Sequence, residues 1–554
     1  MRYFYIVFTL FITLNSNAQA ISETEKFVEI GLVWGLMKYH HPEVSKGIYD
    51  WNSVFIQWCE KAETISTKQD LDSFLFSAIK TYDSKKVIYK KAANLIADDK
   101  IFRENYDYDW IKSMNFDADF TAFLEKLREN SNIGDYYASV TSSNQLNLKN
   151  EKKLPNFDLQ QKSHRLLALF SYWNVIQYWY VNKFLTAEKW SDVPKLLTET
   201  FLNADTDYKF ELAKSNLFNK LGDSHSMRFP AIFSSLRRPN FRTKIVNDTL
   251  EVVRIVDQDQ AKNEGINLGD RIVSIQGKSV KQYLAETVSP MFPAQGFYYY
   301  NMIEDYFALS STSDSLEIGI LSKDKIIPAT IQLNIESKPN NSTKLEKEKD
   351  TRSFYFLQPD IGYINLLDIS KKDLAKAFNE MKTTKGIVID LRNYPKFISD
   401  QDVAKFLYPE RKTFLKPLFP LSKMPSIGDY EVKGTISKII DPFKAGKDNT
   451  DFYKGKIVLL VNRRTISKAE FIGMAIQQSP NCITIGGRTA GAVMNVISYV
   501  FPDGVETIFT GACAFYPDGT VVQKNGLKID EYVGESFFLE HDSFVNAALN
   551  RLRL

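Results

Sequence analysis

The sequence predicts a multidomain α+β protein with a helical N-terminal region, a small β domain and a C-terminal β/α domain. Three observations support this fold class. The chain has 554 residues, more than one hydrophobic core organises. Aromatic and aliphatic residues recur three and four positions apart up to about residue 221, as in amphipathic helices. Beyond residue 353, short apolar strands alternate with helical or irregular segments.

The first element is a candidate export signal at residues 1–18. It has an early Arg2, an apolar stretch from Tyr3 to Leu14 and small residues at its end, which is the pattern of a signal peptide. This stretch is too short to span a bilayer, and no later stretch approaches about 18 uninterrupted apolar residues. We therefore expect an exported protein, periplasmic or extracellular, without an integral membrane segment in the mature chain.

The composition is ordinary for a globular protein and points to no charged partner. A formal net charge of +3 over this length gives no basis for expecting a nucleic-acid partner. The three cysteines, Cys59, Cys482 and Cys513, are an odd number without CxxC spacing, so neither a disulfide framework nor a zinc site is indicated. We expect them to be buried apolar residues, and we expect no metal and no cofactor.

Residues 21–230 form the predicted helical region and contain a weak internal repeat. Two pairs of tryptophans lie 139 positions apart: Trp34 with Trp173, and Trp51 with Trp190. The segment TYDSK at 81–85 matches LGDSH at 221–225 at an offset of 140. Lys85 is then the first-copy equivalent of His225. The histidine is therefore predicted to be a feature of the second copy and not of the packing that both copies share.

Residues 240–335 are predicted to form the small β domain. Its most informative segment is GINLGDRIVSIQG at 265–277, where Gly265 and Gly269 allow tight turns around a short strand. This pattern resembles a PDZ domain, and the resemblance implies that an extended peptide binds as an added strand. The alternative is a β module that only packs against its neighbours. The polar and charged stretch at 336–352 is predicted to be a linker.

Residues 353–554 form the predicted β/α domain. The segments IGYINL, GIVIDLR, GKIVLLVN and CITIGG are short apolar strands separated by helical or irregular connections. The tripeptide Pro-Asp-Gly occurs at 502–504 and again at 517–519. Both copies are predicted to be turns that join antiparallel strands.

The segment KIVLLVNRRTISKAEF at 456–471 has the strongest chemical signal. A buried strand is predicted to end at Val461, and a helix is predicted to start near Ser467. A serine at a strand-to-helix turn presents its hydroxyl at the positive end of the helix, where backbone N–H groups can stabilise an oxyanion. An ordinary helix N-cap has the same local sequence, so the wider pattern has to distinguish the two.

That wider pattern resembles the C-terminal processing, or tail-specific, serine peptidases and their tricorn-core relatives. The resemblance covers roughly residues 220–550. The family signature [ST]-x-S-x-[SA]-E corresponds to TISKAE at 465–470. The resemblance implies a crotonase-like fold for the C-terminal domain and Ser467 as the nucleophile. One branch of the family has a lysine base in a T-x-G-K turn, but the matching turn at 489–492 is Thr-Ala-Gly-Ala.

The other branch is similar to tricorn peptidases and retinoid-binding-protein-like homologues, and it takes a histidine base from a D-x-H-[ST] segment. Residues 223–226 match this segment, which implies His225 as the general base and Ser224 as a residue that orients it. The late glutamate of that branch corresponds to Gln523, which can hold an imidazole by a hydrogen bond but adds no charge. With an ordinary pKa of about 6.5, a histidine can take the serine proton and return it.

The oxyanion hole is predicted to consist of backbone N–H groups. The resemblance implies the Lys468 N–H as one donor and an N–H of Lys396 or Phe397 as the other. Relatives usually have two glycines at this second position, whereas this chain has two residues with large side chains. Any non-proline residue still supplies an N–H donor, although without the backbone freedom of glycine.

Together these features predict an exported serine endopeptidase that acts on a polypeptide or on a protein C-terminus through an acyl-enzyme, assisted by the PDZ-like domain. The alternative is a catalytically inactive homologue that binds peptides in the periplasm or at the cell surface. A third hypothesis comes from the tryptophan and tyrosine content of the helical region. These aromatic residues either belong to the core or form a module that binds glycans or a partner.

Overall fold

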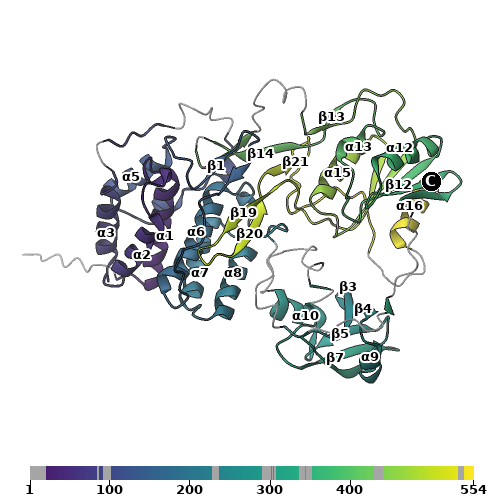
Figure 1. Ribbon diagram of the computed structural model, residues 1–554, viewed down its shortest axis with the longest axis horizontal. Helices are drawn as coiled ribbons and strands as arrows, with labels where there is room; N and C mark the ends of the chain where they lie inside the picture. The colour runs from purple at the N-terminus through teal and green to yellow at the C-terminus, as the bar shows by residue number, and fades with distance from the viewer. Residues whose placement is uncertain are drawn as a thin grey trace, which may run out of the picture.

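The computed structural model describes residues 20–83, 86–91, 101–226, 236–289, 301, 303–304, 307–335, 343–344, 352–422, 424–429, 441–534 and 542–553. The predicted signal peptide, Lys85 and most of the predicted linker lie outside these ranges. None of the helices within these ranges is long and apolar enough to cross a membrane. The elements form a helical group, a β-rich group and a mixed group, so the predicted multidomain architecture of helices and sheets is confirmed (Figure 1).

The helical group packs around two central helices. Its helices are α1 (Glu23–His40), α2 (Trp51–Ala62), α3 (Lys68–Lys80), α4 (Trp110–Ser113), α5 (Ala118–Arg128), α6 (Lys162–Trp179), α7 (Val193–Leu202) and α8 (Asp207–Leu221). Both α1 and α6 are buried along most of their length. Their backbones approach closely, since a Cβ atom at Gly31 would collide with the ring of Phe170. A short hairpin, β1 (Ser139–Val140) and β2 (Leu146–Asn147), completes the group.

The two copies of the sequence repeat contain the same pair of tryptophan hydrogen bonds. In the first copy, the Trp34 and Trp51 indoles each donate to the other residue's carbonyl, at 2.8 and 2.9 Å. In the second copy, Trp173 and Trp190 make the same exchange at 2.8 and 3.1 Å. All four side chains are buried. They are therefore core residues, and the hypothesis that they form a glycan-binding surface is wrong for these tryptophans.

The β-rich group is built on a meander with its own apolar core. Its strands are β3 (Phe241–Val246), β4 (Thr249–Ile255), β5 (Arg271–Ile275), β6 (Lys278–Ser279), β7 (Ser315–Ser322), β8 (Lys325–Gln332) and β9 (Thr343–Lys344), and its helices are α9 (Gln258–Asn263) and α10 (Val280–Tyr283). The main strands pair in the order β3-β4-β5-β7-β8. Ile272 and Ile275 are fully buried in this core.

The mixed group contains a six-stranded sheet in the order β10-β11-β12-β17-β18-β22. Its strands are β10 (Phe354–Gln358), β11 (Ile361–Asn365), β12 (Gly386–Asp390), β17 (Lys456–Val461), β18 (Cys482–Gly486) and β22 (Glu531–Tyr532). All neighbours from β11 to β22 pair in parallel, whereas β10 is antiparallel. The carboxyl ends of β12 and β17 therefore lie at one edge of the sheet, as in other parallel sheets.

Alternating side chains place helices on both faces of this sheet. The helices are α12 (Lys371–Glu380), α13 (Asp400–Ala404), α15 (Lys468–Ile476) and α16 (Ser543–Arg553). Ile457 and Leu459 of β17 pack in the core that includes α12, α13 and α15, whereas Val458 and Leu460 pack under α16. This period of two follows from strand geometry. The apolar run KIVLLV is therefore buried on both faces.

A hairpin of the mixed group inserts into the helical group. Strands β19 (Val496–Val500) and β20 (Glu506–Thr510) pair antiparallel around the first Pro-Asp-Gly turn, which confirms the predicted turn. Tyr499, Phe501 and Phe509 belong to the same buried cluster as the helices, and the hairpin lies against α6 and α8 in Figure 1. The buried Lys214 of α8 forms an ion pair with Asp503 in the turn. The two groups therefore share a core.

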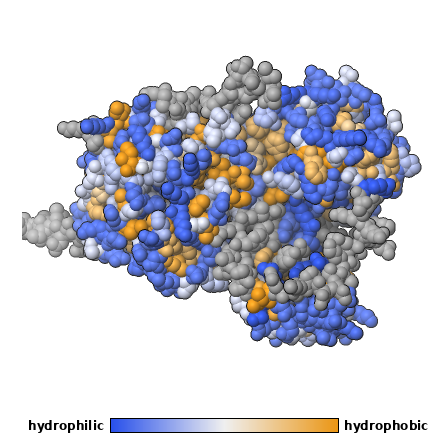
Figure 2. All heavy atoms as spheres, viewed as in Figure 1, coloured by the Kyte–Doolittle hydropathy of each residue, from blue (hydrophilic) through white to orange (hydrophobic). Residues whose placement is uncertain are grey.

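Smaller strands complete the mixed group: β13 (Lys412–Thr413), β14 (Lys416–Pro420), β15 (Ile427–Asp429), β16 (Lys444–Ala445) and β21 (Cys513–Phe515). Phe515 and Val521 pair antiparallel across the second Pro-Asp-Gly turn, as predicted. In Figure 2, hydrophobic residues are exposed along the junction between the helical group and the mixed group. The candidate site lies among these elements.

Candidate active site

Ser467 lies at the turn between β17 and α15. The strand ends at Val461 and the helix begins at Lys468, which confirms the predicted element ends. Ser467 itself has φ 57° and ψ −117°. A non-glycine residue with such a backbone costs about 1–3 kcal/mol and persists only where its surroundings hold it. The turn therefore fixes this one serine in a strained position at the start of a helix.

The residues around Ser467 supply the contacts that hold this position. The Ser467 N–H donates to the Ala492 carbonyl at 2.9 Å and to Glu470 Oε2 at 3.2 Å. The buried Thr465 hydroxyl donates to the Leu391 carbonyl at 2.9 Å. The first and last residues of the TISKAE signature therefore have structural roles on either side of the serine.

Glu470 is fully buried and accepts four hydrogen bonds. Besides the Ser467 N–H, its donors are Thr489 Oγ1 at 2.5 Å and the N–H groups of Gly491 and Ala492 at 2.8 and 2.9 Å. Burial raises the pKa of this carboxyl, and the hydrogen bonds act against that rise. Glu470 thus connects the Ser467 turn to residues 489–492.

The same turn contacts the histidine segment. Ser467 binds the carbonyl of Ala492 through its N–H, and Ser224 Oγ donates to the carbonyl of Ala490 at 2.8 Å. The structure therefore brings the segments of Ser467 and His225 to one turn, although they are far apart in the sequence. This turn is the Thr-Ala-Gly-Ala segment that the resemblance aligned with a T-x-G-K turn.

His225 is 4% exposed, and its two ring nitrogens have different surroundings. Nδ1 lies 2.9 Å from Thr510 Oγ1 at the end of β20. No hydrogen bond within the described ranges occupies Nε2, and none joins the imidazole to Ser467. Burial lowers the pKa of His225, and the Asp223 carboxylate acts in the opposite direction. Serine–histidine contacts are often loose before substrate binds.

Asp223 is completely buried and accepts five hydrogen bonds. Its Oδ1 accepts from the His225 backbone N–H at 3.0 Å, from Thr510 Oγ1 at 2.8 Å and from Gln523 Nε2 at 3.1 Å. Its Oδ2 accepts from the Thr510 N–H at 2.7 Å and from the Tyr180 hydroxyl at 3.1 Å. Every partner is a donor, which suits a carboxylate because it only accepts.

Two predicted orienting residues do not hydrogen-bond to the imidazole. The Ser224 hydroxyl donates to a backbone carbonyl, and Gln523 contacts Asp223 and, at 3.4 Å, the Thr510 hydroxyl. The sequence analysis missed Thr510, and it assigned Asp223 no role of its own. The only available signal for Thr510 was its place at the end of a strand that follows a predicted turn.

The predicted oxyanion donors differ in availability. Lys468 begins α15, and its N–H has no hydrogen-bond partner within the described ranges, as at many helix N-termini. The Lys396 N–H donates to the Leu367 carbonyl at 3.0 Å, so it is already occupied. The Phe397 N–H has no partner in the part of the chain that the structure describes. The Lys468 ammonium donates to the Pro395 and Lys396 carbonyls at 3.1 and 3.3 Å and holds this segment beside the helix.

A pocket of about 430 Å³ opens at Ser467. Its apolar lining consists of Phe419, Pro442, Phe443, Phe471 and Met494. Ser143 and Gln145, from the loop between β1 and β2, contribute a polar part of the wall. The helical group therefore helps to form the cavity beside the candidate nucleophile.

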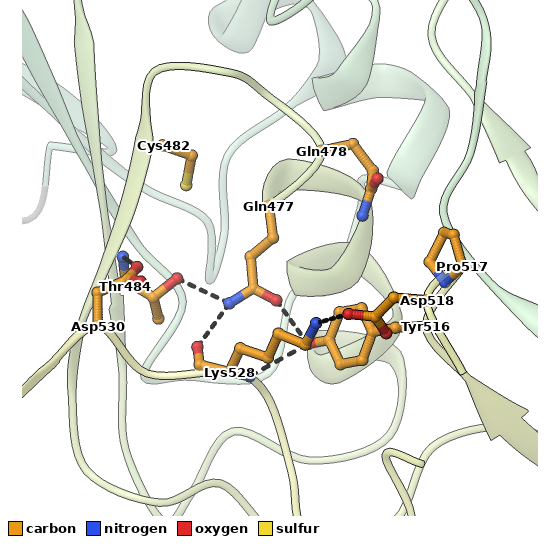
Figure 3. A pocket seen from close by; sticks show the side chains of 9 residues that line it. All are labelled: Gln477, Gln478, Cys482, Thr484, Tyr516, Pro517, Asp518, Lys528 and Asp530. Atoms are coloured by element: carbon orange, nitrogen blue, oxygen red, sulfur yellow. Dashed lines mark hydrogen bonds and ion pairs between the residues drawn. The ribbon is translucent and has the colours of Figure 1, made fainter. Parts of the chain in front are cut away.

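A second pocket of about 320 Å³ lies at the opposite end of α15. Figure 3 shows that its polar side chains bind one another: Gln477 donates to Thr484 and to the Lys528 carbonyl, both at 2.7 Å, and accepts from Tyr516 at 2.6 Å. These groups are satisfied without a ligand. We assign this pocket no chemistry.

A buried carboxylate connects the β-rich group to the loop that precedes Ser467. Glu304 is 1% exposed and forms ion pairs with Arg463, with Arg464 at 3.0 Å and with Lys244 at 2.6 Å. The desolvation of Glu304 opposes its charged form, but these cations hold its pKa below the ordinary value. Both arginines lie in the loop that leads from β17 to Ser467. Within the described ranges, no cluster of His, Cys, Asp and Glu could hold a metal ion.

Residues 420–533 match the model of Peptidase family S41. This range contains Ser467, Glu470, Thr510 and Gln523. The predicted resemblance to C-terminal processing peptidases is confirmed.

The curated relatives that match are named carboxy-terminal processing proteases. The chain is 25% identical over 297 residues to a carboxy-terminal-processing protease of Bartonella bacilliformis, covering 51% of this chain and 58% of the relative. It is 24% identical over 283 residues to the carboxy-terminal processing protease CtpA of Bacillus subtilis, covering 50% and 52%. The chain thus spans between half and two thirds of the length of these relatives.

A solved structure of mature CPAF complexed with lactacystin has a related fold. Its TM-score is 0.51 at 12% sequence identity, and the alignment covers 70% of this chain and 96% of that chain. At this identity the likeness concerns the fold alone.

Proposed function

We propose that this chain is an exported serine endopeptidase that cleaves polypeptides through an acyl-enzyme, with Ser467 as nucleophile and His225 as general base. One observation above all supports this proposal. A single turn, residues 489–492, binds the strained Ser467 through Ala492 and the histidine segment through Ala490. The S41 match and the processing-protease relatives support the same class of reaction.

The proposed reaction uses two protein groups in sequence. Nε2 of His225 takes the proton of the Ser467 hydroxyl as the oxygen attacks the scissile carbonyl carbon. The imidazolium then donates that proton to the departing amine, which leaves Ser467 acylated. Water, deprotonated by the same imidazole, hydrolyses the ester and restores the serine. The lowered pKa of His225 keeps the imidazole neutral, and therefore basic, at neutral pH.

The oxyanion of the tetrahedral intermediate would bind to backbone N–H groups. The Lys468 N–H is the first donor, because it follows the nucleophile and is free of other hydrogen bonds in the described part of the chain. The Phe397 N–H is the second. We leave Lys396 out, since its N–H already donates to Leu367. Two aligned N–H donors in a site of this kind contribute several kcal/mol to catalysis.

Several features outside the dyad belong to the same proposal. Residues 1–18 direct export to the periplasm or the exterior, and residues 240–335 act as a PDZ-like module that binds an extended peptide or a protein C-terminus. Residues 353–554 form the crotonase-like catalytic domain. The buried Glu304 fixes the PDZ-like module against the loop that precedes Ser467.

Covalent labelling with a fluorophosphonate probe tests this function. The purified full chain is expected to bind one probe molecule at Ser467, identified by peptide mass, and Ser467→Ala is expected to bind none. Ser479→Ala, which changes a buried serine at the far end of α15, serves as the control and should label normally. Absence of labelling in the folded wild-type protein would instead support the inactive peptide-binding homologue.

The pocket beside Ser467 predicts a preference for apolar side chains next to the scissile bond. Its aromatic lining offers burial worth about 1.5–3 kcal/mol to a leucine- or phenylalanine-sized group. Phe471 lines it and stacks edge-on against Phe414 with ring centroids 4.9 Å apart. Phe471→Ala should enlarge the pocket and shift cleavage in a peptide library at least tenfold from leucine toward tryptophan. An unchanged preference would show that the side chain binds elsewhere.

A further inference from the structure

We infer that Thr510 and Asp223 form a hydrogen-bonded relay that fixes the tautomer of His225, so that Asp223 supplies the negative charge that Gln523 lacks. This inference rests on the proposed function, because it concerns the base of that reaction. It concerns two residues that do not touch substrate. Both are therefore positioning residues.

Counting hydrogens determines the direction of the relay. The Thr510 hydroxyl has one hydrogen and lies 2.8 Å from Asp223 Oδ1, a carboxylate oxygen that can only accept. That hydrogen therefore points at Asp223. The contact of 2.9 Å between Thr510 Oγ1 and His225 Nδ1 then requires the imidazole to donate. Nδ1 carries the ring proton, and the lone pair resides on Nε2, where a general base needs it.

The surroundings hold both ends of this relay. Asp223 follows α8 in the helical group, and Thr510 ends β20 in the mixed group. The Thr510 N–H donates to Asp223 Oδ2 at 2.7 Å, and the His225 N–H donates to Oδ1 at 3.0 Å. Thr510 and Asp223 are 0% exposed. The hairpin that inserts into the helical core therefore aligns the hydroxyl between the carboxylate and the imidazole.

Gln523 has a different role from that of a glutamate at its position. Its Nε2 donates to Asp223 Oδ1 at 3.1 Å, and its Oε1 is buried without a hydrogen-bond partner among the described residues. An amide donor stabilises the Asp223 carboxylate, whereas a second carboxylate there would repel it at close range. The chain thus keeps one buried negative charge near the base, at position 223.

Among the residues that the structure describes, few other charged or titratable groups face this cluster. Tyr180 and Tyr172 lie against Asp223, and burial raises the pKa of both phenols, so they remain neutral. The Lys524 ammonium interacts electrostatically with Asp223 and donates to the Leu185 carbonyl at 2.6 Å. Asp223 is therefore the anion that a protonated His225 meets.

The test compares Thr510→Val with Thr510→Ser in the full chain. The valine keeps the volume but removes the hydroxyl, so kcat/KM for a peptide substrate should fall about 10²- to 10³-fold, mostly through kcat. The serine keeps the hydroxyl and should remain within about fivefold of wild type. Thr507→Val is the matched control: Thr507 is buried on the same strand, its hydroxyl has no partner in the described ranges, and its loss should change kcat/KM less than twofold.

The pH dependence of kcat/KM distinguishes loss of His225 orientation in Thr510→Val from general damage to the fold. The neutral imidazole is the active form, so kcat/KM declines as pH falls through the His225 pKa. The relay favours imidazolium, because Nδ1–H donates toward a carboxylate. Without it the pKa falls, and the acid limb of the Thr510→Val profile should move to lower pH. An activity and a profile equal to wild type in this variant would overturn the relay.

Two further measurements distinguish failure of the relay from failure of the proposed function. Two-bond ¹H–¹⁵N spectra of histidine-labelled protein should show Nδ1–H for His225 in the resting wild type and a mixed tautomer in Thr510→Val, whether or not the protein is a peptidase. Gln523→Glu should lower kcat/KM at least tenfold. A gain of activity in Gln523→Glu, or an Nε2–H tautomer in wild type, would contradict the relay.

Discussion

Ser467→Ala and His225→Ala should each lower kcat for peptide hydrolysis by about 10⁴- to 10⁶-fold. Alanine at 467 removes the attacking oxygen, and alanine at 225 removes the group that takes its proton. The 489–492 turn binds both the Ser467 backbone and the segment that contains His225. Within the described ranges, the two side chains form no hydrogen bond to each other. The size of these two losses therefore tests whether the residues meet when substrate binds.

The double variant is the decisive measurement. If the two residues act as a unit, removing either one already abolishes their shared contribution to kcat. The Ser467→Ala/His225→Ala double variant should then have a kcat no lower than that of the slower single variant. Losses that multiply would mean that the two side chains act independently, and the dyad would be wrong. Single-turnover measurements on a peptide with an activated ester separate acylation from deacylation. His41→Ala, which replaces a buried histidine of the helical group, controls for general damage and should keep wild-type kcat if folded.

Local patterns in the sequence predicted those parts of the site that depend on local geometry. The unbroken apolar run in KIVLLV predicted a buried strand, and the strand-to-helix turn followed from where that run ends. The paired tryptophans were detectable because both copies use the same hydrogen bonds at the same spacing. The D-x-H-[ST] match pointed to His225 as the candidate base, because a short local motif is enough to identify it.

The remaining parts depend on contacts between distant segments. Thr510 contacts Asp223 and His225 only because β19 and β20 insert into the helical core, and nothing in the spacing of those residues encodes that docking. The Lys396 N–H, predicted as a possible oxyanion donor, donates instead to the Leu367 carbonyl. Backbone partners of this kind do not depend on side-chain identity. A residue pattern therefore could not reveal them.

Glu470→Ala should lower the free energy of unfolding of the mixed group by about 3–5 kcal/mol, the range expected when a buried charged partner is removed. The carboxylate receives four hydrogen bonds, one from the Ser467 N–H and three from the 489–492 turn. Without it, the N–H groups of Gly491 and Ala492 remain buried with no acceptor, at about 1–3 kcal/mol each. Urea unfolding followed by tyrosine and tryptophan fluorescence measures the total. Glu380→Ala, an exposed residue on α12 whose lysine partner is 3.7 Å away, should change stability by less than about 0.5 kcal/mol.

Amide hydrogen exchange can show which segment Glu470→Ala destabilises, and serine labelling can show whether this affects Ser467. Glu470→Ala should accelerate exchange at residues 489–492, because this turn loses the acceptor of two of its N–H groups. The strained Ser467 backbone should relax as well, since the carboxylate is one of its two hydrogen-bond acceptors. Fluorophosphonate labelling should then slow at least tenfold even at temperatures where the protein remains folded. Unchanged exchange and labelling would show that the backbone alone maintains the turn. In that case the strain at Ser467 would have to be held by Ala492 and the helix, without Glu470.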